Sequence, residues 1–144
     1  MRKSLVAVLL PASLAVSTAA AAAVAPVFTR AAARPGDRVG VVQRARIGPL
    51  QGHSGIAVYL IPLSRAPSQP FDGPPPPSLA RHRLGELVAG RHGSWHLWFH
   101  VPAVRPGAYT TLVWCRPCGG STYPHGSVFA GGLLADDGVL DVRR

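Results

Sequence analysis

The sequence predicts an all-β protein built as an antiparallel sandwich or barrel of six to eight short strands. Short apolar runs recur along the chain, and its 16 glycines and 15 prolines fall mainly between them, where turns belong. The clearest run, Ser94 to Val101, alternates apolar and mixed residues with period two, as in a strand with one buried face. No segment after the N-terminal leader has the periodicity of a convincing helix.

Residues 1–23 are predicted to form a cleaved signal peptide. A basic start precedes an apolar run from Leu5 to Val16, and an alanine tract from Ala19 to Ala23 supplies the small residues of a cleavage site. The alternative is an uncleaved anchor, because Leu5 to Val27 nearly reaches the length that spans a bilayer. We therefore expect a secreted or cell-envelope protein.

The strands are predicted in a single domain, residues 34–144, after a lead-in at 24–33. A turn at 34–37 leads into a strand from Arg38 to Gln43, and the continuous apolar run Ile56 to Ile61 predicts a central strand. Residues 64–81 have no periodicity and six prolines, which indicates a stiff, extended loop.

The second half of the domain contains the more regular patterns. Strands are predicted at Arg83 to Val88, Ser94 to Val101 and Gly107 to Cys115. The chain ends in a predicted hairpin whose arms are 132–135 and 139–142, joined by an Asp-Asp-Gly turn.

The motif Pro106-Gly107-Ala108-Tyr109, with the turn at 35–37 and Val101-Pro102, resembles exported bacterial immunoglobulin-like sandwiches. The resemblance covers most of the mature chain and implies a single antiparallel immunoglobulin-like sandwich. It also implies that Tyr109 lies at a strand corner, where its hydroxyl bonds to the backbone. It specifies fold more than function.

Charge restricts the partners that we expect. The formal net charge is +9, and the basic residues that supply it are scattered, with no run of five. Such a chain is weakly attracted to anionic ligands of the envelope or the extracellular space. No nucleic-acid partner is expected, because export separates the protein from the nucleic acids of the cell. The sequence also has no stripe of basic residues interleaved with aromatic residues. Membrane contact is expected only through an uncleaved signal.

The two cysteines are predicted to form a disulfide. The run W-C-R-P-C at 114–118 is similar to the active-site motif of thioredoxin-like oxidoreductases, but that motif occurs early in a βαβ unit. Here the chain ends soon afterwards, and the Gly-Gly-Ser that follows cannot start a good helix. In an oxidising compartment, Cys115 and Cys118 therefore pair, with a stabilisation of roughly 2 kcal/mol.

The alternative is a redox or copper-handling protein. The Pro106–Tyr109 motif followed by Cys115 also resembles the copper loop of cupredoxins. The histidine expected next is replaced by Cys118, and the only methionine, Met1, lies in the leader. His125 would have to complete the site, and a blue-copper centre needs a second histidine.

A further alternative is a zinc site formed by the two cysteines and His125 with one of three further histidines: His92, His96 or His100. His96 and His100 cannot share one ion, because four residues of strand separate them by about 13 Å. They are expected on a half-exposed face beside Trp98. Zinc also requires reduced thiols, so no cofactor is predicted.

No catalytic residue is predicted. The stretch Gly52–Gly55 lacks the last glycine of a nucleophile elbow, since Ile56 stands in its place. Asp136 and Asp137 are neighbours in a tight turn and would point apart. We therefore expect a non-catalytic binding or structural module. Its predicted binding surface is the loop from Cys115 to Phe129, together with the Pro-rich loop, because loops on rigid sheets commonly carry binding. The residues of this surface are Trp114, Arg116, Tyr123 and His125.

Overall fold

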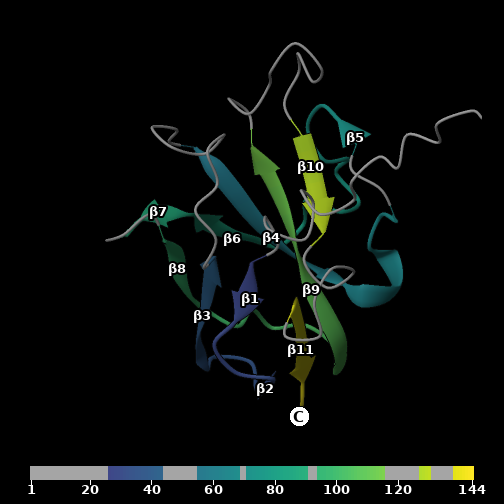
Figure 1. Ribbon diagram of the computed structural model, residues 1–144. Coiled ribbons are helices and arrows are strands. Elements are labelled where there is room, and N and C mark those ends of the chain that lie inside the picture. Colours follow the sequence, from purple (N-terminus) through teal and green to yellow (C-terminus); the bar gives the residue numbers. More distant parts are fainter. Residues whose placement is uncertain (1–25, 44–54, 69–70, 91–93, 116–126, 131–137) are drawn as a thin grey trace, which may run out of the picture.

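The computed structural model describes residues 26–43, 55–68, 71–90, 94–115, 127–130 and 138–144. Within these ranges the chain forms eleven strands and one short 3-10 helix, arranged as two sheets (Figure 1). The predicted all-β class is therefore confirmed. Within these ranges, no helix is long and apolar enough to cross a bilayer. The predicted signal peptide, residues 1–23, lies outside the described ranges.

The smaller sheet has four strands in the order β1 (Val27–Phe28), β3 (Arg38–Gln43), β8 (Trp95–His100) and β7 (Val88–Ala89). All of its pairings are antiparallel, and β3 pairs with β8 over its full length. The predicted strands at Arg38–Gln43 and Ser94–Val101 are the two central strands of this sheet.

The turn before β3 has the chemistry that the sequence indicates. Gly36 has φ +88°, a conformation that L side chains rarely adopt. The Asp37 Oδ2 accepts the Arg34 backbone N–H at 2.9 Å, and the Asp37 N–H donates to the Arg34 carbonyl at 3.0 Å. These bonds fix the point at which the chain enters the smaller sheet.

The larger sheet has seven strands around β9 (Gly107–Cys115). Along one edge, β9 pairs antiparallel with β4 (Ile56–Pro62), which in turn pairs with β6 (Arg83–Glu86). Along the other edge, β9 pairs first with β11 (Val139–Val142) and then with β10 (Ser127–Ala130). The strand predicted to be central, β4, is therefore paired on both sides.

Two very short strands complete the larger sheet. The first, β2 (Ala32–Ala33), pairs parallel with β11, although β1 a few residues earlier pairs with β3. The N-terminal segment therefore crosses from one sheet to the other. The second, β5 (Phe71–Asp72), comes from the Pro-rich loop and pairs with β10.

The main core lies between the two sheets. Because side chains alternate across a strand, every second residue of each long strand points into this space. In β8, Trp95 and Phe99 are buried while Trp98 between them is half exposed, as the period-two pattern predicts. The other long strands contribute Val39, Val41, Ile56, Val58, Leu60, Tyr109, Val113, Leu140 and Val142.

A second core lies on the opposite face of the larger sheet. Its buried members come from β4 and β9: Ala57, Tyr59, Ile61 and Leu112. The described residues of the Pro-rich loop, 64–81, cover them with Ala66, Leu79 and Ala80, and Trp114 completes the cluster. The loop runs beside β4 and β9 in Figure 1. It is therefore a packed cover over the sheet as well as a surface loop.

Several sequence predictions need correction. The segment Arg83 to Val88 is interrupted at Leu87, so that β6 and β7 join different sheets. The predicted loop from Cys115 to Phe129 ends earlier, because β10 pairs with β9 from Ser127 onwards. Of the predicted C-terminal hairpin, the second arm is β11, and the first arm lies outside the described residues.

Candidate functional site

The predicted binding loop is described only at its two ends. Trp114 pairs through its backbone with Ala57 and Val128, and its half-buried side chain packs on the second core. Its indole Nε1 is buried without a hydrogen-bond partner in the part of the chain that is described. The backbone of Cys115 ends β9 opposite Ile56. Arg116, Cys118, Tyr123 and His125 lie outside the described residues, so the disulfide, the metal alternative and the binding loop stay predictions.

The face predicted to carry His96, Trp98 and His100 is the outer face of the smaller sheet. Trp98 is 50% exposed, and the guanidinium of Arg38 lies 5.0 Å from the centre of its ring. The ring of Trp98 lies against Gly40: a Cβ atom added to Gly40 would be 3.0 Å from the Trp98 Cζ3. The described residues contain no group of three or more His, Cys, Asp or Glu side chains that could hold a metal ion.

A basic pocket lies elsewhere, at the margin of the Pro-rich cover. It has a volume of about 460 Å³, and we call it the arginine pocket because three arginines line it. Arg65 comes from the start of the cover, Arg81 from its end, and Arg105 from the connection between β8 and β9. The remaining walls are formed by Leu60, Ile61, Pro62, Ser78, Leu79, His82, Ala103, Val104 and Tyr109.

The local structure explains why the two ends of the cover meet at this pocket. At the end of β4 the chain turns through the 3-10 helix η2 (Leu63–Arg65), closed by a bond of 3.1 Å from the Ala66 N–H to the Leu63 carbonyl. At the other end, the Leu60 N–H donates to the His82 carbonyl at 2.9 Å. The chain that leaves β4 is thereby bonded back to β4 before β6 begins.

Arg105 is positioned by a tyrosine. The Tyr109 hydroxyl donates to the Arg105 carbonyl at 2.8 Å, and the ring of Tyr109 is buried in the main core. This is the backbone bond that the Pro-Gly-x-Tyr resemblance implies for Tyr109. It ties the connection before β9 to the first residues of that strand, and Arg105 is exposed at the pocket.

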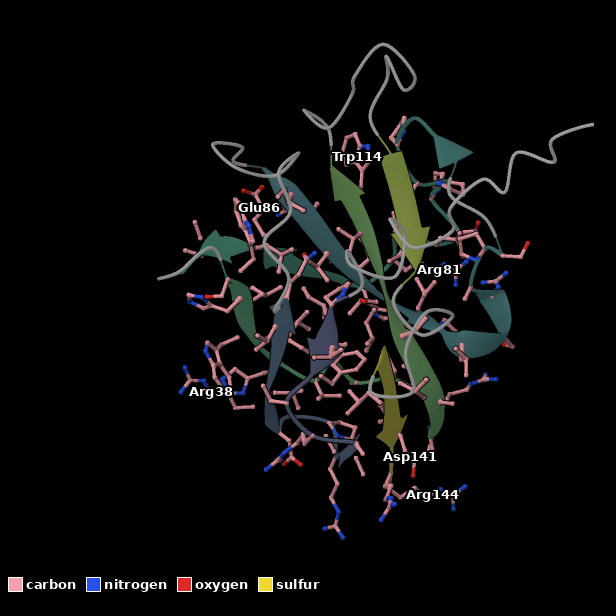
Figure 2. All side chains as sticks on the ribbon, in the orientation of Figure 1. Arg38, Arg81, Glu86, Trp114, Asp141 and Arg144 are labelled. Carbon is pink, nitrogen blue, oxygen red and sulfur yellow. The ribbon has the colours of Figure 1, made fainter. Side chains whose placement is uncertain are left out.

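The three arginines of the pocket are free of described ion pairs. Three carboxylates are paired with other arginines: Asp37 with Arg30 at 3.6 Å, Glu86 with Arg83 at 2.6 Å and Asp141 with Arg143 at 2.9 Å. In Figure 2, Arg81 lies on the opposite side of the view from Glu86. The pocket therefore concentrates positive charge that no described acidic side chain neutralises.

This arrangement suits the binding of an anion. A guanidinium is charged at all physiological pH values and offers a planar fork of donors that matches a carboxylate or a phosphate. Sequence reasoning missed the pocket, because Arg65, Arg81 and Arg105 are far apart in the chain and each is an ordinary member of a scattered set. The return of the cover to β4 brings Arg65 and Arg81 together, and the connection between β8 and β9 adds Arg105.

Comparison of the chain with protein families, with curated proteins and with solved structures found no match.

Proposed function

We propose that this chain is an exported, non-catalytic binding module of immunoglobulin-like architecture that binds an anionic ligand in the arginine pocket. The observation that carries the proposal is that Arg65, Arg81 and Arg105 line one cavity without a described carboxylate. Like charges held close together repel one another. An anion between them relieves this repulsion and gains charge-assisted hydrogen bonds, which are among the stronger ones in proteins.

Strand order and one hydrogen bond support the immunoglobulin-like architecture. The order β1-β3-β8-β7 opposite a sheet containing β4, β9 and β11 corresponds to the A-B-E-D and C-F-G sheets of immunoglobulin domains. The bond from the Tyr109 hydroxyl to the Arg105 carbonyl has the form of a tyrosine corner, in which a tyrosine near the start of strand F bonds the backbone upstream.

The pocket's chemistry supports binding over catalysis. A general base is normally oriented by a third group, such as a carboxylate. The described lining offers His82 without such a partner, and the Tyr109 hydroxyl already donates to a carbonyl. Export, which rests on the leader at 1–23, would bring the pocket to anionic ligands of the envelope or the extracellular space.

The test is calorimetric titration of the purified mature protein with inorganic pyrophosphate at fixed ionic strength. We expect saturable binding that falls by about tenfold or more in the triple variant R65Q/R81Q/R105Q, because each charge-assisted hydrogen bond lost weakens binding by about that factor. The control, R34Q/R38Q/R144Q, removes the same charge from outside the pocket and should bind almost as tightly as the wild type. Equal losses in both variants, or no saturable binding in the wild type, would overturn the proposal.

A further inference from the structure

A second hollow adjoins the arginine pocket. It has a volume of about 510 Å³ and is more open to solvent. Its lining consists of Pro62, Leu63, Ser64, Pro106, Gly107, Ala108 and Tyr109. Pro62 and Tyr109 also line the arginine pocket, so the two cavities share these lining residues. We call the second cavity the apolar hollow.

The two cavities differ in chemistry. The described lining of the arginine pocket includes three arginines and His82 together with apolar residues. None of the described residues that line the apolar hollow is charged, and Ser64 and Tyr109 are its only polar side chains. Asp141, whose backbone pairs with that of Ala108, is held in an ion pair with Arg143 at 2.9 Å. The described lining of the arginine pocket is therefore charged, and that of the apolar hollow is not.

From this juxtaposition we propose that the ligand is an amphiphilic anion. Its phosphate or carboxylate head lies among Arg65, Arg81 and Arg105, and a short alkyl chain crosses Pro62 and Tyr109 into the apolar hollow. This inference rests on the proposed function, because it assigns a head to the arginine pocket and adds a tail. Apolar surface that is removed from water on binding contributes to affinity in proportion to its area. The chain should therefore strengthen binding only as far as the hollow extends.

The experiment is a titration series at fixed ionic strength with inorganic phosphate and with ethyl, butyl and hexyl monophosphate, all below their aggregation concentrations. In the wild type, affinity should rise by about two- to fourfold for each methylene buried. In A108W, an indole should fill the hollow, so that inorganic phosphate still binds and the dependence on chain length disappears. The matched control is A89W, an exposed strand alanine on the smaller sheet, which should keep the dependence.

The outcomes separate the two proposals. If all the alkyl phosphates bind as inorganic phosphate does, the arginine pocket stands and the tail site is wrong. If none of these phosphates binds and inorganic pyrophosphate does not bind either, the proposed function fails as well. If hexanol binds as tightly as hexyl phosphate, the anionic head is wrong.

The same chemistry has two sources, a free amphiphile or a lipid headgroup with its chains. Sedimentation with phosphatidylglycerol vesicles, compared between the wild type and A108W, distinguishes them. Vesicle binding that A108W abolishes supports a lipid source, whereas binding of monomeric alkyl phosphate without vesicle binding supports a free amphiphile. Vesicle binding that A108W leaves unchanged, without binding of the monomers, contradicts the inference.

Discussion

The outer faces of the two sheets are built differently. On the larger sheet, Tyr59, Ile61 and Leu112 are buried beneath the Pro-rich loop. On the smaller sheet, Trp98 and Val88 remain 50% and 57% exposed, and no described segment packs over them. β4 of the larger sheet is buried on both faces, whereas β8 of the smaller sheet alternates, because a covered face must exclude water and an open face need not.

This difference has a consequence for the candidate site. The Pro-rich loop that covers the larger sheet starts from β4 and returns to the same sheet at β6. Both ends of this loop lie beside the end of β4. Arg65 and Arg81 occupy these ends, so the arginine pocket is a by-product of covering the larger sheet. On the open face, the guanidinium of Arg38 lies beside the exposed ring of Trp98.

The largest effect is expected from truncating the covered face. Leu112 is fully buried in the second core, and Leu112→Ala should lower the free energy of unfolding by about 2–5 kcal/mol, as buried leucines do when a cavity remains. Denaturation by urea measures the change. The control on the open face, Val88→Ala, should change stability by no more than about 0.5 kcal/mol. Similar values for the two variants would mean that the faces are not different.

An intermediate effect is expected from the cover itself. Leu79 is a half-buried residue of the Pro-rich loop that packs on the second core. Leu79→Ala should lower the free energy of unfolding by roughly 1–2 kcal/mol, because it exposes part of this core. It should also accelerate cleavage within residues 64–81 during limited proteolysis of the native protein. Leu63→Ala, at a half-buried leucine outside the second core, is the control. Unchanged cleavage in Leu79→Ala would show that packing does not hold the loop.

The smallest effect is expected on the open face. Trp98→Thr should cost no more than about 1 kcal/mol, mainly the cation–π contact with Arg38. Acrylamide quenching of tryptophan fluorescence should lose its most accessible component in this variant. In Trp95→Phe, which alters a buried ring of the same strand, that component should persist. A destabilisation of several kcal/mol by Trp98→Thr would mean that the open face is covered in the folded protein.

Local patterns predicted the strands that carry most of the core. The alternation in β8, the continuous apolar run of β4 and the bounds of β9 could each be read from the sequence, because burial on one or two faces leaves its own periodicity. The hydroxyl bond of Tyr109 followed from the Pro-Gly-x-Tyr resemblance. The short strands β1, β2 and β5 could not be predicted, because two residues carry no periodic signal.

The sequence by itself therefore determined the class of the fold and the strands whose side chains must alternate between core and solvent. Tertiary structure alone decided that residues 64–81 lie over the larger sheet, and that three arginines from distant segments line one cavity. The physical reason is that periodicity records whether a face is buried and not by what. Which segment covers an apolar face, and which charges meet at its margin, depends on contacts between residues far apart in the chain.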